Sequence, residues 1–217
     1  IVNWFNNLNL ENPEHYNQSV LLQLNKEMGN QELEEGLKKL INHHDALRIN
    51  LNSASGEMFF NETHLSNSFS LDRYELSPGS IVDERLKEIG TTLKSSMNLE
   101  TELLIKGASI RTEGMHYLLI ICHHVVIDGV SWRILLDDLY AVLNNPTVNL
   151  PAKTASVKDW SSYLTSDSVV NSAKRNQRNS ISEVDFIQKE NTAANTREEY
   201  NLSFDKEKIM DLMSSAH

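Results

Sequence analysis

Two adjacent histidines, His123 and His124, are the residues of this sequence whose type and position are best suited to chemistry. An imidazole has an unperturbed pKa of about 6.5, so it can accept and return a proton near neutral pH. The pair follows an apolar run at residues 117–122, which is typical of a buried strand. Adjacent side chains of an extended segment point to opposite faces. Only one of the two histidines can therefore enter a given cavity, and the other must be structural.

Asp128 and Gly129 follow the histidine pair and open the next helix. The carboxylate of Asp128 can turn back to orient an imidazole, or it can pair with a nearby cation. Gly129 leaves space beside such a site and permits a backbone turn that other residues avoid. The segment from His123 to Gly129 therefore predicts a proton-transfer site where a strand ends and a helix begins.

A structural pair of histidines and a metal site are the alternatives to this interpretation. Histidines at strand ends are commonly structural residues with satisfied hydrogen bonds. Histidine and aspartate also bind zinc, but adjacent histidines on opposite faces chelate poorly, and no third and fourth ligand cluster is visible beside them. We therefore expect no metal. The single cysteine, Cys122, lies in the apolar run, which favours a buried and inert thiol.

Hydrophobic patterns predict the elements that must position this motif. Helices are predicted after a cap at Asn30, over residues 81–97, and after Asp128. Turns at 53–56 and 112–114 join hairpins. Strands are predicted at residues 19–24, 46–51, 57–60, 69–76, 103–111 and 115–122. Mixed strands and helices indicate an α/β protein, a two-layer sandwich with the site at one edge of the sheet.

The composition limits the class of protein. A chain of 217 residues with a net charge of −10 is a poor partner for nucleic acid or for an anionic membrane. No stretch reaches the roughly 18 apolar residues of a membrane span. One cysteine forms no intrachain disulfide and fits a reducing, cytoplasmic location. Both chain ends look like cuts in a longer polypeptide.

The chain divides by composition into two parts. Residues 1–165 contain the predicted strands and helices, and we expect them to form one lobe that carries the histidine motif. Residues 166–197 are rich in serine, asparagine, threonine, lysine and glutamate, as a connecting segment is. A strand near 199–204 and a helix after Asp205 would begin a second lobe. We therefore interpret residues 166–217 as a crossover and the start of an incomplete C-terminal lobe.

The motif resembles the His-His-x-x-x-Asp-Gly motif of the chloramphenicol-acetyltransferase-like superfamily. The extended motif, from His123 to Leu135, has the sequence His-His-Val-Val-Ile-Asp-Gly-Val-Ser-Trp-Arg-Ile-Leu. In this extended form the motif is similar to that of the epimerization domains of nonribosomal peptide synthetases. Other segments agree with that family in the same order: Trp-Phe at 4–5, His-Tyr-Asn-Gln-Ser at 15–19, His-His-Asp-Ala-Leu-Arg at 43–48, Leu-Pro-Ala-Lys-Thr at 150–154 and Lys-Asp-Trp at 158–160.

The resemblance implies roles for the motif residues. His124, the second histidine, would face the reaction tunnel as the acid/base group, and Asp128 would form a structural ion pair with Arg48. The implied reaction inverts the Cα of an aminoacyl or peptidyl thioester on the 4'-phosphopantetheine arm of a peptidyl carrier protein, with no directly bound cofactor or metal. Neighbouring synthetase domains would be further partners.

The chain departs from the family in one respect. Epimerization domains carry a later Glu-Gly-His-Gly-Arg motif in a C-terminal lobe, and nothing here matches it; Glu113-Gly114-Met115-His116 precedes the histidine motif and is predicted to be a hairpin turn. We therefore expect this chain to lack the opposing acid/base and to be inactive alone. A condensation domain, which forms peptide bonds, is the main alternative. A glycerolipid-type acyltransferase and a non-catalytic docking module are the others.

Overall fold

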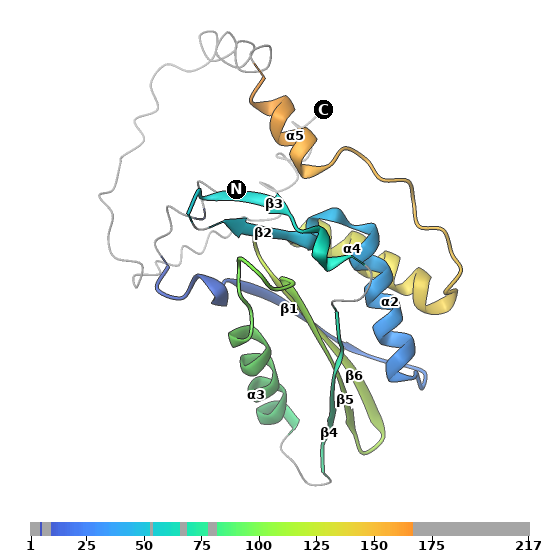
Figure 1. Ribbon diagram of the computed structural model, residues 1–217. Coiled ribbons are helices and arrows are strands. Elements are labelled where there is room, and N and C mark those ends of the chain that lie inside the picture. Colours follow the sequence, from blue (N-terminus) through green and yellow to red (C-terminus); the bar gives the residue numbers. More distant parts are fainter. Residues whose placement is uncertain (1–4, 6–9, 53, 66–68, 78–81, 167–217) are drawn as a thin grey trace, which may run out of the picture. The chain divides into compact units, whose positions relative to one another are not determined.

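The computed structural model describes residues 5, 10–52, 54–65, 69–77 and 82–166 (Figure 1). Its α-helices are α2 (Asn30–His43), α3 (Val82–Ser95), α4 (Gly129–Asn144) and α5 (Val157–Leu164). Its strands are β1 (Asn17–Gln23), β2 (Ile49–Asn52), β3 (Glu57–Phe60), β4 (Asp72–Glu75), β5 (Ile105–Thr112) and β6 (Met115–His123). Three 3-10 turns are η1 (Pro13–His15), η2 (Asp45–Arg48) and η3 (Glu62–His64).

A four-stranded sheet carries the histidine motif (Figure 1). Its strand order is β1-β6-β5-β4, so the strand that ends in the motif lies in the interior of the sheet. β6 pairs antiparallel with β1 and β5, whereas β4 runs parallel to β5. The β1–β6 register places Asn17 opposite His123. This register brings the first residues of β1 beside the histidine motif, more than 100 residues later in the chain.

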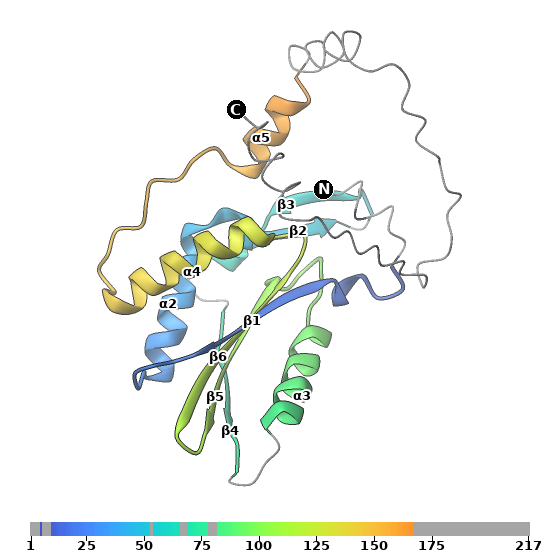
Figure 2. The ribbon, with the colours of Figure 1, turned by 180° about the vertical axis from the view of Figure 1, so that it is seen from behind.

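Helices cover both faces of this sheet (Figures 1 and 2). Because side chains alternate along a strand, Leu118 and Ile120 of β6 pack in the same cluster as the apolar residues of α2 and α4. Leu119 and Ile121 face the other way and pack against α3. β2 and β3 form a separate two-stranded antiparallel sheet. The mixed α/β class predicted from the sequence is confirmed, with α3 forming a layer on the second face.

Two local predictions need correction. The helix cap is Gly29 and not Asn30, which is already the first residue of α2 and accepts a hydrogen bond from Ser109 Oγ at 2.7 Å. The predicted strand 46–51 is shorter, because residues 45–48 form the turn η2 before β2 begins at Ile49. The hairpin turns are confirmed, and Gly56 and Gly114 adopt the positive φ that favours glycine.

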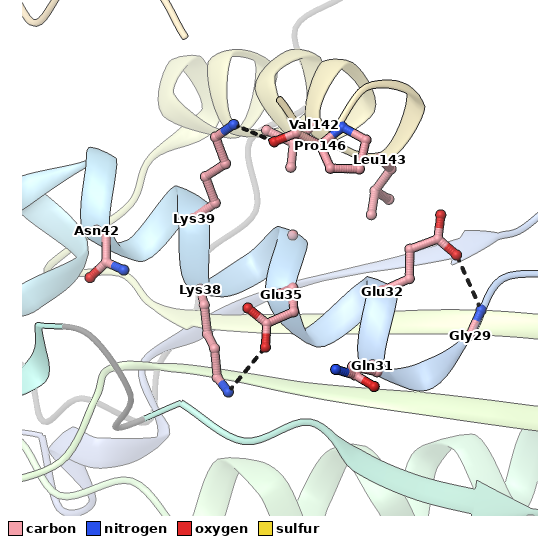
Figure 3. A pocket seen from close by; sticks show the side chains of 11 residues that line it. Gly29, Gln31, Glu32, Glu35, Lys38, Lys39, Asn42, Val142, Leu143 and Pro146 are labelled. Carbon is pink, nitrogen blue, oxygen red and sulfur yellow. Dashed lines mark hydrogen bonds and ion pairs between the residues drawn. The ribbon is translucent and has the colours of Figure 1, made fainter. Parts of the chain in front are cut away.

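Helices α2 and α4 pack closely at Gly36, where an added Cβ would lie 2.8 Å from Leu143 Cδ2. Lys39 of α2 connects this helix to the segment after α4, because its ammonium donates to the carbonyl of Pro146 at 2.7 Å (Figure 3) and to that of Val148 at 2.6 Å. A hollow of about 770 Å³ lies along this junction. Its lining comes from α2 and the C-terminal end of α4, so it is distinct from the histidine motif.

The predicted crossover at 166–217, with its strand near 199–204 and the helix after Asp205, lies outside the described residues except for Ser166. The proposed boundary between the two lobes therefore stays a prediction. No helix in residues 5–166, within the described ranges, is both long enough and apolar enough to cross a membrane.

The close approach of α2 and α4 predicts opposite outcomes for two mid-helix glycines. Gly90→Ala should raise the free energy of unfolding by up to about 1 kcal/mol, because alanine favours helix and an added Cβ there meets nothing within 4 Å. Gly36→Ala should not raise the free energy of unfolding, because its added Cβ would force the Leu143 side chain to move. Urea denaturation of the two variants measures the difference. Equal stabilisation would show that α2 and α4 are more loosely packed.

Candidate functional site

His123 is a structural residue at the end of β6. Its side chain is fully buried, and its backbone N–H donates to Leu104 O at 2.9 Å. The ring Nδ1 accepts from Val125 N at 3.2 Å, so Nε2 carries the proton and donates to Pro13 O at 2.8 Å. Burial lowers the pKa of His123, which keeps the ring neutral. The prediction that His123 is packed inside is confirmed.

His124 points to the opposite face and remains partly exposed. Its backbone N–H donates to Tyr16 O at 2.8 Å, which extends the β1–β6 ladder by one bond. Its ring stacks on Tyr16 with centroids 5.1 Å apart and an interplanar angle of 14°. Ring Nδ1 lies 2.8 Å from Ile127 O, and Nε2 lies 3.0 Å from Gln18 Nε2. Hydrogen-bond partners at both ring nitrogens and the stacked Tyr16 ring therefore fix the position of the imidazole.

The partners of His124 determine which of its nitrogens carries the proton. A carbonyl only accepts, so Nδ1 must donate to Ile127 O. The indole Nε1 of Trp132 only donates, and it lies 2.8 Å from Gln18 Oε1. The amide nitrogen of Gln18 consequently faces His124 and donates to its Nε2. These partners fit the tautomer that is protonated on Nδ1 and accepts from Gln18 at Nε2. The Nε2 lone pair of this tautomer is the group that a general base would use.

Gln18 and Trp132 are the site residues whose role the sequence did not indicate. Both lie in segments that resemble epimerization domains, but the contact of Gln18 with His124 spans 106 positions and that of Trp132 with Gln18 spans 114. One signal was available. Gln18 shares a strand face with Val20 and Leu22, which pack in the core. A polar residue on an otherwise apolar strand face needs a hydrogen-bond partner.

Asp128 is the N-terminal cap of α4. Its Oδ1 accepts from the backbone N–H and from the hydroxyl of Ser131, both at 2.7 Å. The Ser131 N–H, followed by the Ser131 hydroxyl, lowers the pKa of Asp128. Gly129 is the first helical residue and has no positive φ, so the special backbone predicted for it is wrong. An added Cβ there would meet nothing within 4 Å, so the space predicted beside the motif is present.

The predicted ion pair between Arg48 and Asp128 is not formed. Arg48 is buried, and its guanidinium binds Asp45, three residues earlier, together with the carbonyls of Ile41 and Asn42. Those carbonyls belong to the last turn of α2, where orphan acceptors need donors. Asp128 is instead exposed and satisfied by Ser131. Each charge finds a partner within its own turn, and this local pairing replaces the long-range bridge.

A histidine–carboxylate pair connects His44, the C-cap residue of α2, to Asp138 of α4. His44 Nε2 lies 2.8 Å from Asp138 Oδ2, and burial lowers the pKa of His44 although Asp138 opposes that shift. His43 completes a group whose ligand atoms all lie within 4.8 Å of one another. Lys153 lies with these three residues in the lining of a separate hollow of about 350 Å³, and its charge also lowers the pKa of His44. A positive charge already faces this space, which disfavours a cation there.

The burial difference between the two histidines predicts different stability effects. His123→Leu should lower the free energy of unfolding by about 2 kcal/mol or more, because Val125 N–H and Pro13 O lose their partner inside the protein. His124→Ala should cost roughly 1 kcal/mol or less, since its ring is partly exposed. Chemical denaturation of both variants checks this. Similar losses would mean that the two rings are equally structural.

The capping role of Asp128 sets a modest cost for its removal. Asp128→Ala should lower the free energy of unfolding by about 1 kcal/mol and Asp128→Asn by only a few tenths, because asparagine also caps helices. Loss of a buried ion pair would cost about 3–5 kcal/mol. The lowered pKa means that the carboxylate stabilises the fold above about pH 4 and loses this effect as the pH falls. The Asn variant should not show that loss, which unfolding at pH 7 and pH 3 measures.

Comparison with known proteins identifies the family. The family model described as "Condensation domain" matches residues 3–181. The chain is 36% identical over 173 residues to surfactin synthase subunit 2 of Bacillus subtilis (strain 168), and 34% identical over 169 residues to tyrocidine synthase 1 of Brevibacillus parabrevis. Each alignment covers 76% of this chain but only 5% and 16% of those two proteins.

Solved structures agree with the fold. The chain is similar to the epimerization domain from the third module of tyrocidine synthetase B, with a TM-score of 0.72 and 27% identity, over 83% of this chain and 44% of that one. The starter condensation domain of the rhizomide synthetase shares the fold, with a TM-score of 0.61 and 14% identity over 76% and 42% of the two chains. The predicted chloramphenicol-acetyltransferase-like α/β lobe is thereby confirmed, and this chain belongs to the condensation-domain family of the nonribosomal peptide synthetases.

Proposed function

We propose that this chain provides the His124 side of an epimerization site, which inverts the Cα of an aminoacyl or peptidyl thioester. The thioester would be presented on the 4'-phosphopantetheine arm of a peptidyl carrier protein, in a cytoplasmic synthetase. The observation that carries this proposal is the hydrogen-bonded series of Trp132, Gln18 and His124. Gln18 and Trp132 come from two segments that resemble epimerization domains, and Gln18 connects Trp132 to the motif histidine.

The geometry of His124 fits removal of a carbon-bound proton. A thioester carbonyl acidifies the neighbouring Cα–H. The C–H bond would break as its proton moves to the Nε2 lone pair, and its electrons would pass into the thioester enolate. The proton on Nδ1 would stay there and remain hydrogen-bonded to Ile127 O. That carbonyl would partly stabilise the positive charge that develops on the imidazolium.

Inversion requires a proton to return on the opposite face of the planar enolate. His124 lies on one lobe, so we propose that the second acid/base comes from the C-terminal lobe expected to follow residues 1–165. Residues 1–217 would then bind the carrier arm without completing the reaction. Neighbouring synthetase domains would supply and remove the carrier protein.

Condensation is the second candidate function, and the family description of the matching model favours it. In that reaction His124 would assist an amine in attacking a thioester carbonyl. The neutral imidazole described above serves either reaction. The 27% identity to a solved epimerization domain, against 14% for the starter condensation domain, favours epimerization.

Exchange of the Cα proton with solvent deuterium distinguishes the two functions. The intact synthetase, loaded with a carrier-bound aminoacyl thioester in deuterated water, should exchange the Cα proton and yield both stereoisomers. His124→Ala should slow this exchange by about 10²–10⁴-fold. The exposed His15 offers a matched control, and His15→Ala should exchange at the normal rate.

Two results would overturn this assignment. Peptide-bond formation without Cα exchange would identify a condensation domain. Near-normal exchange in the His124→Ala enzyme would move the proton chemistry to another group and leave the histidine motif as scaffold.

A further inference from the structure

We propose that Gln18 is the positioning residue that holds His124 as a neutral base with its proton on Nδ1. This inference rests on the proposed proton transfer at His124. A glutamine amide can rotate by 180° and offer either its oxygen or its nitrogen to a neighbour. At this site Trp132 prevents the rotation by bonding to the amide oxygen of Gln18. The amide nitrogen is therefore held toward the imidazole of His124.

Trp132 fixes the orientation of the Gln18 amide. Its indole N–H donates to Gln18 Oε1 at 2.8 Å, and the indole itself is buried, with 8% of its surface exposed. Rotation of the amide would place two donors, the indole N–H and the amide NH₂, against each other. A buried N–H without an acceptor costs roughly 1–3 kcal/mol. The amide nitrogen of Gln18 is therefore held toward His124.

This orientation selects the protonation state of His124. The Gln18 N–H donates to Nε2, so any species with a proton on Nε2 would face donor against donor. Both the imidazolium and the other neutral tautomer carry a proton there. Ile127 O also requires the proton on Nδ1. Gln18 and Ile127 together leave one favourable state, the neutral ring with its lone pair on Nε2.

The same contact places a condition on turnover. A substrate Cα–H can reach the Nε2 lone pair only when the Gln18 N–H releases it. Once the proton has moved to Nε2, the amide can no longer bond to that nitrogen, so the imidazolium is disfavoured and loses its proton readily. Loss of that proton to solvent restores the neutral base for the next turnover, whereas its return to the same face of the enolate would give back the starting configuration.

The tautomer provides a test that does not depend on activity. In this chain, ¹⁵N NMR of labelled histidine should show His124 neutral and protonated on Nδ1 at pH 7. Gln18→Glu replaces the donor with a carboxylate that accepts from both Trp132 Nε1–H and a protonated Nε2. We expect His124 to become protonated on both nitrogens in this variant. Gln23→Glu is the matched control, because it adds the same charge to an exposed position of β1 and should leave the spectrum unchanged.

Activity of the intact synthetase gives the second measurement. Gln18→Ala should lower the turnover number for Cα exchange by roughly 10- to 100-fold, the size of effect that misplacement of a reacting group by about 1 Å produces. The KM for the carrier-bound substrate should change little, because Gln18 acts through His124. Trp132→Phe keeps an aromatic ring but removes the indole donor, so it should reduce turnover in the same direction. Denaturation measurements on both variants confirm that the fold is retained.

The possible failures can be told apart. If His124→Ala abolishes exchange while Gln18→Ala and Gln18→Glu behave like the wild type in both measurements, Gln18 has no positioning role and the proposed function stands. If His124→Ala exchanges normally, the proposed function fails whatever Gln18 does. An unchanged His124 spectrum in Gln18→Glu would overturn the inference even if turnover fell.

Discussion

The antiparallel register between β1 and β6 is the constraint on which the site depends. Asn17 lies opposite His123, and the next backbone bond, from His124 N–H to Tyr16 O, continues the ladder into the motif. Tyr16 and Gln18 thereby fall on the same face as the His124 ring. A slip of one residue would turn both side chains to the other face and separate them from His124. Val20 and Leu22 of β1 hold this register, because their packing against the core would be lost in the same slip.

Sequence patterns predicted the parts of the molecule that depend on local periodicity. The strands around the motif, the three main helices and the opposite orientations of His123 and His124 all follow from alternation and helical spacing. Patterns of this kind do not report which segments meet. Gln18 and His124 are 106 positions apart, and only the pairing of β1 with β6 brings them together. The motif residue was therefore predictable, whereas its hydrogen-bond partners were not.

The charged residues show why an ion pair inferred from family resemblance was wrong here. Arg48 binds Asp45 and the carbonyls of Ile41 and Asn42 at the end of α2, all within seven residues. Burial alone would raise the pKa of Asp45, but hydrogen bonds from Lys153 and Arg48 lower it overall. Asp128 similarly finds its donors in the first turn of α4. Helix ends supply unsatisfied donors and acceptors close at hand, and these satisfy a nearby charge at smaller entropic cost than a distant partner does.

The two histidines show how one lobe could hold the proposed base, His124, in a fixed position. The complete reaction would still need a second acid/base group. Both ring nitrogens of His123 form hydrogen bonds, Nε2 as donor to Pro13 O and Nδ1 as acceptor from Val125 N–H. These bonds fix the backbone from which the His124 side chain projects. The Nδ1 of His124 donates to Ile127 O, and its Nε2 accepts from the Gln18 side chain, which would have to release that nitrogen to a substrate. All of these partners lie within the described part of the chain, so the contacts of His124 do not depend on a substrate. In the proposed reaction, inversion at carbon would still need a donor on the opposite face of the enolate, because an imidazole fixed at one strand end cannot reach both faces. Preorganisation of His124 would then make the first proton transfer a property of this lobe, and the stereochemical outcome a property of the group on the opposite face.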